Sequence, residues 1–167
     1  GAIGNGCDVN RVVVTLGTAL VAYRHAGEHA GPFSPNGCWG PYPGGGFYEL
    51  ATCDEGCKAL DWAVEWISGD RSVSAFDSLA ETCRKRMGHD ISGMPMFYPD
   101  RIGDDNAWKP ASEGDQTSRA YAVLEGIAFS LRQLVTSTLG SSRDLDRVVV
   151  TGGGSKSDIW LQIISDV

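Results

Sequence analysis

The segment from Val148 to Val167, VVVTGGGSKSDIWLQIISDV, constrains the fold most, because a strand, a glycine turn and a helix follow one another without a break. The β-branched run Arg147 to Thr151 predicts the strand. Three glycines follow, and Ser155 with Asp158 three residues later forms a capping-box pattern that predicts a helix start. Apolar residues at spacings of three and four predict one buried stripe, consisting of Trp160, Ile163, Ile164 and Val167.

The glycine turn lies between the end of a strand and the N-terminus of a helix, a position that suits an anion or a flat ligand. Without Cβ atoms, Gly152, Gly153 and Gly154 let a ligand approach the backbone closely. The unpaired N–H groups that open the helix favour negative charge. The segment is not a P-loop, because no Gly-Lys-Ser/Thr ends it. Two alternatives stay open at this point, a nucleotide site and a tight turn without a ligand.

The length of 167 residues allows one domain with a well-buried core. Lys and Arg number 14 against 21 Asp and Glu, and the resulting net charge of −7 argues against broad binding to nucleic acid or anionic lipid. No apolar run approaches the about 20 residues of a membrane span, and no signal-peptide pattern opens the sequence. We therefore expect no nucleic-acid partner and no membrane partner.

The cysteines indicate the cellular setting, and the two chain ends indicate a fragment. The five cysteines lack paired CxxC spacing and predict neither a disulfide framework nor a zinc ribbon; they are Cys7, Cys38, Cys53, Cys57 and Cys83. We expect a reducing, cytoplasmic interior and no metal site in this chain. The sequence begins with Gly1 and stops inside a predicted helix without a C-terminal cap, so we expect a fragment truncated at both ends.

The first third of the chain is rich in β-branched runs. Arg11 to Thr15 and Ala19 to Tyr23 predict a hairpin whose tip contains Gly17 and Thr18. The Gly- and Pro-rich segment Arg24 to Gly46 predicts a long surface connection, and Phe47 to Thr52 predicts a third strand. Together these strands predict an antiparallel meander.

After the third strand the apolar period changes from two to about 3.6. It predicts a helix from about Gly56 to Ser68 and a second helix from about Ser72. Met94 to Tyr98 predicts a short strand, Pro99 to Gly114 a polar loop, and Asp115 to Leu139 the longest helix. The helix residues expected to face inward are Leu60, Ala63, Val64, Ile67, Phe76, Leu79, Ala80, Cys83, Leu124, Ile127, Leu131, Val135 and Thr138.

The order of these elements predicts an α/β fold with a mixed sheet, in which an antiparallel meander is followed by right-handed crossovers to parallel strands. We expect helices on both faces, as in the ribonuclease H-like lobe of actin-like ATPases. Residues 1–167 then form one domain. The strands beginning at Arg11, Ala19, Phe47 and Arg147 should share the sheet, and Gly17–Thr18 and Gly152–Gly153 should open onto one cleft.

Five stretches, in the same order as in a known family, resemble the FGGY carbohydrate kinases, which include xylulokinase, ribulokinase, gluconokinase and glycerol kinase. They are GAIGNG at Gly1 to Gly6, VVVTLGTAL at Val12 to Leu20, CKALDW at Cys57 to Trp62, AVLEGIAFSLR at Ala122 to Arg132, and TGGGSKSDIWLQIISDV at Thr151 to Val167. Their order and spacing make the resemblance specific. It identifies nearly the whole chain as similar to the C-terminal, nucleotide-binding lobe of that family.

The resemblance implies roles for the matched positions. In the family the Gly-Thr of the hairpin contacts nucleotide phosphates, which corresponds to Gly17 and Thr18. The glycine turn wraps the adenosine, which corresponds to Gly152 and Gly153, with a small polar residue at Ser157. A hairpin tip that offers backbone N–H groups and a hydroxyl suits phosphate oxygens. The alternative for Thr18 is a turn residue that caps its own hairpin.

The resemblance implies no catalytic residue in this chain. The family's base is an aspartate a few residues before the segment matching Gly1 to Gly6, and Asp8 follows too late to replace it. The sugar-binding residues lie mostly in the N-terminal lobe. Ser118 and Arg119 stand where the family usually has an acidic or amide residue and an apolar one. Cys57 occupies the position of a nucleotide-contacting glycine in glycerol kinase.

The implied activity is an ATP-dependent transfer of the γ-phosphoryl group to a sugar or polyol hydroxyl, with Mg²⁺ and in the cytoplasm. The resemblance is compatible with a homodimeric parent enzyme, and the fragment alone should be inactive. The alternative is a non-catalytic, actin-like nucleotide-binding module used for regulation or assembly. An aspartate upstream of Gly1 would favour the kinase.

Overall fold

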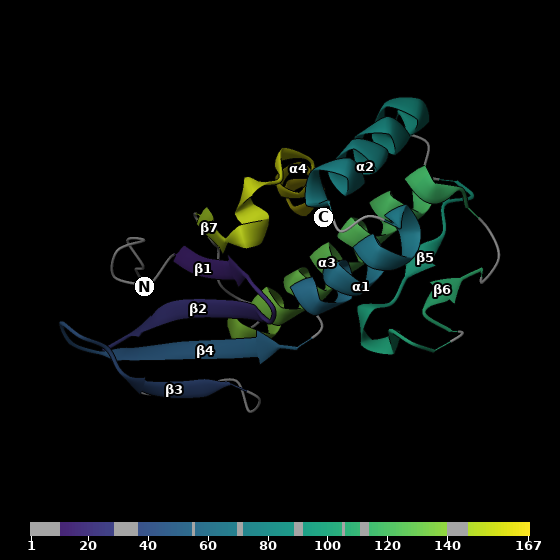
Figure 1. Ribbon diagram of the computed structural model, residues 1–167. Helices are drawn as coiled ribbons and strands as arrows, with labels where there is room; N and C mark the ends of the chain where they lie inside the picture. The colour runs from purple at the N-terminus through teal and green to yellow at the C-terminus, as the bar shows by residue number, and fades with distance from the viewer. Residues whose placement is uncertain are drawn as a thin grey trace.

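The computed structural model describes residues 11–28, 37–54, 56–69, 72–88, 92–104, 106–110, 114–139 and 147–167. A mixed sheet stands beside a group of helices (Figure 1). Its strands are β1 (Arg11–Leu16), β2 (Leu20–Gly27), β3 (Cys38–Pro41), β4 (Phe47–Cys53) and β7 (Arg147–Gly152), in the spatial order β3-β4-β2-β1-β7. The helices are α1 (Cys57–Ser68), α2 (Val73–Met87), α3 (Gln116–Leu139) and α4 (Asp158–Asp166).

The strand pairing confirms the mixed sheet. β1 pairs antiparallel with β2, β2 antiparallel with β4, and β1 parallel with β7. The four predicted strands therefore share one sheet. The parallel pair places Leu16 opposite Gly152. It thereby brings two segments that are far apart in the sequence together at the predicted site.

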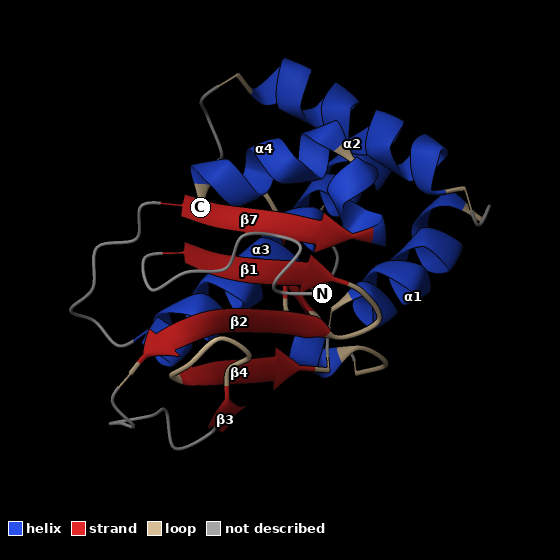
Figure 2. Cartoon of the chain, turned by 90° about the vertical axis from the view of Figure 1, so that its left-hand side faces the viewer, coloured by secondary structure: helices blue, strands red, loops and turns tan. Residues whose placement is uncertain are grey.

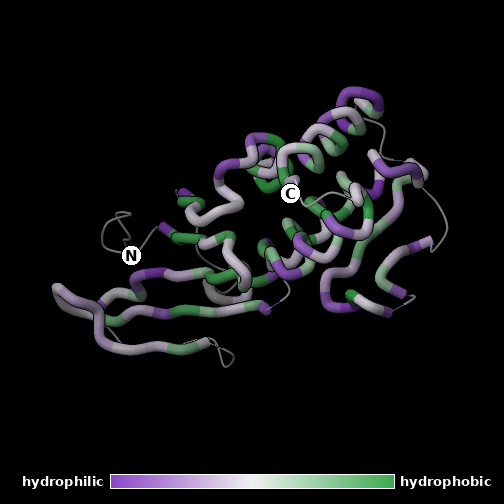
Figure 3. The backbone as a smooth tube through the Cα atoms, viewed as in Figure 1, coloured by the Kyte–Doolittle hydropathy of each residue, from purple (hydrophilic) through white to green (hydrophobic). Residues whose placement is uncertain are grey.

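The core lies between the sheet and the helices. Val12, Val14 and Leu16 of β1 are fully buried and belong to one hydrophobic cluster with residues of all four helices. Apolar segments of β1, α3 and α4, drawn in green, meet in the middle of the molecule (Figure 3). When the sheet is viewed face-on, α3 lies behind it, α4 and α2 lie beyond β7, and α1 lies beside the strand ends (Figure 2). Helix α3 packs against β2 and β4, and the apolar stripes of all four helices contribute to this single cluster.

The residues predicted to face inward largely do so. Leu79 and Val135 are partly buried, and the other ten are buried. The environment of the Thr138 side chain lies outside the described part. Local periodicity was sufficient to predict the buried residues of these helices, because one apolar stripe of each helix faces the core.

The segment predicted as a surface connection, Arg24 to Gly46, contains two pieces of strand that the sequence pattern did not reveal. β2 extends to Gly27, and β3 pairs antiparallel with β4, with Trp39 opposite Glu49. β3 is mostly exposed and has no alternating pattern, so its backbone pairing with β4 specifies it.

A buried ion pair joins β2 and β4 and was also missed. The Arg24 guanidinium donates to the Glu49 carboxylate from Nε at 2.9 Å and from Nη2 at 2.5 Å, and both side chains are almost fully buried. Removing one partner of such a pair leaves an uncompensated buried charge, which costs about 3–5 kcal/mol. The pair therefore holds the two adjacent strands β2 and β4 together inside the sheet.

The predicted strand Met94 to Tyr98 forms, but it does not join the main sheet. β5 (Met96–Phe97) pairs antiparallel with β6 (Trp108–Lys109) in a separate two-stranded sheet. The predicted polar loop Pro99 to Gly114 thus contains a strand, and a 3-10 turn, η2 (Pro99–Arg101), precedes it. Aromatic contacts explain the arrangement, since the Phe97 and Trp108 rings lie 4.8 Å apart.

A column of aromatic rings connects α1 to this small sheet. Trp62 and Trp66 of α1 stack at 5.5 Å, and Trp66 stacks on Trp108 at 5.8 Å. The Arg119 guanidinium of α3 lies over the Trp66 ring at 5.1 Å and the Trp108 ring at 5.7 Å. Arg119, which departs from the family pattern, therefore has a cation–π role in holding α3 against α1.

Several predictions concern residues outside the described part, namely the GAIGNG segment at residues 1–6, Cys7 and Asp8. Among the described residues, four cysteines are not joined in disulfides: Cys38, Cys53, Cys57 and Cys83. None of the described helices is both long enough and apolar enough to cross a bilayer.

Candidate functional site

Two of the predicted ligand-binding turns lie at the same end of the sheet. Gly17 and Thr18 follow β1, Gly153 follows β7, and the parallel register sets the last residues of the two strands opposite each other. Figure 2 shows both strands ending on the same side, beside the start of α1. A hydrogen bond of 3.2 Å between the Thr15 and Thr151 hydroxyls joins the two strands just before the turns. The structure therefore brings the two turns together, while the shared cleft stays a prediction.

The hairpin tip is fastened to the N-terminus of α1. The carbonyl of Gly17 accepts from the N–H of Cys57 at 3.0 Å, and that of Thr18 accepts from the N–H of Lys58 at 3.3 Å. These carbonyls satisfy helix N–H groups that have no partner within the helix. A Cβ at Gly56 would lie 2.8 Å from the Leu20 nitrogen, so glycine is needed there for the close approach. The Thr18 side chain is exposed.

Cys57 stands where the resemblance has a nucleotide-contacting glycine. Burial, with a smaller effect from the charge of Asp61, raises the pKa of its thiol to about 11. At neutral pH it is therefore a protonated, half-buried thiol at the base of the hairpin tip. Its structural contribution is the backbone N–H that holds Gly17.

The three glycines after β7 differ in what requires them. Gly152 has a φ of 93°, and a Cβ there would lie 2.5 Å from the Leu16 carbonyl oxygen. At Gly154 a Cβ would lie 2.5 Å from Cζ3 of Trp160 and 2.8 Å from Cβ of Leu16. At Gly153 no atom lies within 4 Å, and the residue is not among the glycines with positive φ. The fold itself requires Gly152 and Gly154, whereas it does not require Gly153.

The predicted helix cap was wrong by two residues. Gly153–Lys156 form a 3-10 turn, η3, in which the Ser155 hydroxyl donates to the Gly152 carbonyl at 2.8 Å. Helix α4 begins after Ser157, whose hydroxyl accepts from the N–H of Trp160 at 3.2 Å. Both serines could cap, and the 3-10 turn uses the first one. Ser157, one of the predicted nucleotide contacts, is thus a buried helix cap, 6% exposed.

Asp77 of α2 is a neighbour of this cap that sequence reasoning missed. Burial raises the pKa of its carboxyl. The hydrogen bond with the Ser157 hydroxyl lowers this pKa, and two nearby acidic side chains raise it. It follows the buried Phe76 on a partly exposed face of α2, so periodicity gave no signal for it. It marks where α2 meets the N-terminus of α4.

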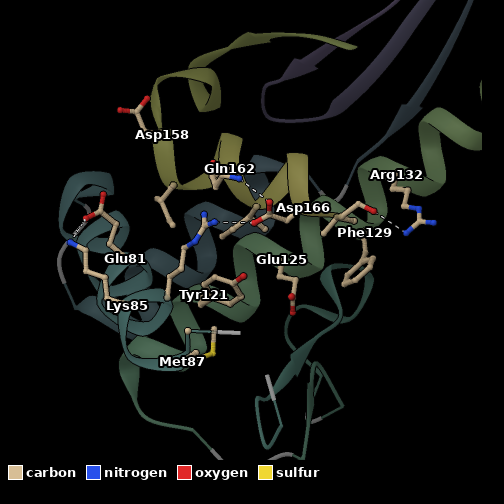
Figure 4. Close-up of a pocket in the computed structure, with 15 residues that line it drawn as sticks. Glu81, Lys85, Met87, Tyr121, Glu125, Phe129, Arg132, Asp158, Gln162 and Asp166 are labelled. Atoms are coloured by element: carbon tan, nitrogen blue, oxygen red, sulfur yellow. Dashed lines mark hydrogen bonds and ion pairs between the residues drawn. The ribbon is translucent and has the colours of Figure 1, made fainter. Parts of the chain in front are cut away.

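Two grooves lie elsewhere on the described surface. One of about 1070 Å³ lies between α2, α3 and α4, with Tyr121, Glu125 and Phe129 on its wall (Figure 4). Its charges are largely paired internally, as in the ion pair between Arg84 and Asp166 at 3.1 Å. A second, of about 940 Å³, lies between β5 and α3. Neither is lined by a predicted nucleotide contact, so neither is our candidate site.

Comparison with solved structures shows which fold surrounds these turns. A xylulose kinase from Rhodospirillum rubrum has a TM-score of 0.81 at 17% sequence identity, over 99% of this chain and 35% of that one. Plasmodium falciparum glycerol kinase with ADP has a TM-score of 0.72 at 19% identity, over 98% and 35%. The expected lobe of an actin-like ATPase is therefore confirmed.

Sequence comparisons give the family. The xylulose kinase of Staphylococcus xylosus is 25% identical over 182 residues, which cover 100% of this chain and 36% of that protein. The chain thus spans about a third of the length of this relative. A family model described as the FGGY family of carbohydrate kinases, C-terminal domain, matches residues 12–167. Because this match extends over most of its length, the chain belongs to the FGGY family of carbohydrate kinases, within the C-terminal domain.

Proposed function

We propose that this chain is the nucleotide-binding part of a longer, ATP-dependent carbohydrate kinase. The observation that carries the proposal is the open backbone at Gly153 beside the hairpin tip Gly17–Thr18, on two adjacent parallel strands. Nothing within the described chain requires a glycine at position 153, and a ligand lying against the backbone supplies a reason. The relatives named as xylulose kinases, and the glycerol kinase with ADP, support the same function.

In this proposal the site residues have two kinds of role. Gly17 and Thr18 bind phosphate oxygens through backbone N–H groups and the Thr18 hydroxyl. Gly153 offers a flat backbone surface to the purine, while Gly152 and Ser157 give the turn and the helix start their shape. The exposed cations Lys58 and Lys156 adjoin the two turns and favour an anionic ligand locally, despite the net charge of −7.

The reaction is a transfer of the γ-phosphoryl group to a hydroxyl oxygen of a sugar or polyol. The acceptor oxygen bonds to the γ-phosphorus, the bond from that phosphorus to the ADP oxygen breaks, and the hydroxyl proton passes to a base. In such transfers the protein mainly positions the groups and stabilises the developing charge. The proposal gives this chain the nucleotide, and gives the base and the acceptor site to the remainder of the longer kinase.

Mg²⁺ accompanies ATP in this chemistry. Among the described residues, no group of three or more His, Cys, Asp or Glu side chains comes together as metal ligands would. The proposal assigns the ion no ligand among these residues. Magnesium commonly uses one or two carboxylates together with substrate phosphates.

A coupled assay of ADP release against a panel of pentoses, hexoses and polyols tests the proposal. The full-length protein should turn over at least one acceptor, and residues 1–167 alone should turn over none, because they cannot position the acceptor. A full-length protein that binds ADP but phosphorylates nothing would favour the non-catalytic, actin-like module. Acceptor-dependent turnover by the 167 residues would contradict the assignment of roles and direct attention to Asp8 and Asp61.

The proposed setting is the cytoplasm, where ATP is available, and the proposed parent enzyme is a homodimer. Light scattering of the full-length protein measures its oligomeric state directly. A monomeric mass would remove the dimer from the proposal without affecting the kinase assignment.

A further inference from the structure

Trp160 lies where the glycine turn, helix α3 and strand β1 meet. It is in the first turn of α4 and only 1% exposed. Its backbone N–H donates to the Ser157 hydroxyl, and its indole Nε1–H donates to the Leu124 carbonyl of α3 at 3.2 Å. One side chain thus joins the helix that follows the turn to the longest helix of the domain.

The ring of Trp160 also explains why position 154 is a glycine. A Cβ at Gly154 would lie 2.5 Å from the Cζ3 atom of the ring and 2.8 Å from Cβ of Leu16. Trp160 and Leu16 therefore both pack against Gly154 where a side chain would otherwise be. Leu16 is fully buried and directly precedes Gly17 of the hairpin tip.

These contacts form one continuous series from α3 through Trp160 and Gly154 to Leu16, and so reach both predicted ligand-binding turns. A nucleotide that binds Gly153 with its purine and Gly17–Thr18 with its phosphates depends on the spacing between the turns. Misplacement by about 1 Å weakens such binding strongly. The spacing between the two turns then depends on Trp160 and Leu16, which pack beneath the turns and are not among the proposed ligand contacts.

We propose that Trp160 is a positioning residue for the nucleotide, which holds the glycine turn against Leu16 and thereby fixes the distance between the two turns. The inference rests on the proposed function, because it assumes that the nucleotide occupies both turns. Two properties of Trp160 contribute to this role. Its ring packs against Gly154, and its Nε1–H fastens the ring to α3.

The test uses the full-length protein, with ADP titrated by calorimetry and the free energy of unfolding measured in urea. Trp160→Phe keeps an aromatic ring beside Gly154 but removes the hydrogen bond to Leu124. Its dissociation constant for ADP should rise about fivefold, the effect of losing one such bond. Trp160→Leu also removes the ring and should weaken ADP binding further than Trp160→Phe does.

Trp108→Phe is the matched control. Trp108 is also a buried tryptophan, and its Nε1 has no hydrogen-bond partner among the described residues. It lies in β6, in the small sheet rather than at the turns, so Trp108→Phe should leave the ADP affinity unchanged. If Trp160→Phe loses stability while its ADP affinity stays at the wild-type value, or if Trp108→Phe weakens ADP equally, the positioning role is wrong.

Gly153→Val in the same titrations distinguishes the two levels of the proposal. If Gly153→Val weakens ADP binding and Trp160→Phe does not, only the role of Trp160 is overturned. If Gly153→Val leaves ADP binding unchanged, the proposed nucleotide site is itself wrong, and the inference about Trp160 is wrong with it.

Discussion

The chain contains two glycine triplets, and they serve different purposes. Gly44, Gly45 and Gly46, between β3 and β4, all have positive φ, at 100°, 110° and 76°. In the triplet after β7, only Gly152 has a positive φ, side chains pack against Gly154, and Gly153 meets open space. The first triplet is fully explained by its turn. The second contains a position that the turn does not explain, and that position is our candidate for ligand contact.

The same Gly-Gly-Gly sequence therefore has different structural roles at the two places. A run of three glycines predicts a turn in both places. Backbone angles and the space around each Cβ position then separate glycines that the chain requires from one that it does not. Substitutions in the two triplets should accordingly affect stability and nucleotide binding in different combinations.

Gly152→Ala should have the largest effect, on stability. The added Cβ would press on the Leu16 carbonyl, and alanine disfavours the positive φ, so we expect a loss of about 3 kcal/mol in the free energy of unfolding. Urea unfolding followed by circular dichroism measures it. Gly153→Ala is the adjacent control and should change stability by less than about 0.5 kcal/mol. Equal losses at the two positions would erase the distinction within the triplet.

Gly153→Val should show the opposite combination. A β-branched side chain would occupy the open space beside the turn, and we expect ADP affinity in the full-length protein to fall about a hundredfold, or about 2.7 kcal/mol. Calorimetric titration with ADP measures the change. Unfolding in urea should match that of Gly153→Ala closely. A valine variant that binds ADP normally would make the second triplet a plain turn, like the first.

Gly45→Ala probes the first triplet. No atom lies within 4 Å of the added Cβ, so the cost comes from the positive φ alone and should be about 1–2 kcal/mol of stability. ADP affinity should equal that of the wild type, because the turn precedes β4, at the end of the sheet opposite to the one where β1 and β7 end. A weaker affinity for ADP in Gly45→Ala would mean that stability and binding cannot be separated by position, and the comparison would fail.

Asp115→Ala lies outside both triplets and calibrates the stability measurements. Its carboxylate accepts from the Ser118 N–H at 2.9 Å at the start of α3, and losing this cap should cost about 1 kcal/mol at pH 7. The Arg86 guanidinium, and then the Ser118 N–H, hold the pKa of Asp115 well below its usual range.

The pH dependence of this effect follows from the direction of the pKa shift. Because the pKa is depressed in the folded state, the carboxylate stabilises the fold above the unfolded pKa of about 3.9 and loses this contribution as the pH falls through the folded value. The difference between wild type and Asp115→Ala should therefore be smaller at about pH 3 than at pH 7. An unchanged difference would mean that the cap does not depend on the charge.

Sequence reasoning succeeded where structure is local. The helices have apolar stripes of period 3.6, and β1, β2 and β7 are β-branched or apolar runs bounded by turn residues. It failed where a partner far along the chain decides the outcome. β3 exists because β4 pairs with it, and β5 lies in a separate sheet because Trp108 packs on Phe97. Neither pairing leaves a local pattern.

The candidate site was predictable in part for the same reason. Gly17, Thr18 and Gly152 to Gly154 lie in turns that local patterns and family resemblance identify. The sequence could not assign Ser157 to the helix cap, because Ser155 is an equally good cap until the 3-10 turn uses it. Nor could it distinguish Gly153 from its neighbours, since that depends on Leu16 and Trp160.

The parallel pairing of β1 with β7 also determines when the candidate site can form during folding. Thr15 and Thr151 are 136 positions apart, whereas the β1–β2 hairpin closes over a few residues. Contacts of such separation carry a large loop-closure entropy and form late. We expect the hairpin tip to form early, before the glycine turn is brought beside it. The candidate site should then form only in the last stage of folding, when β7 has paired with β1.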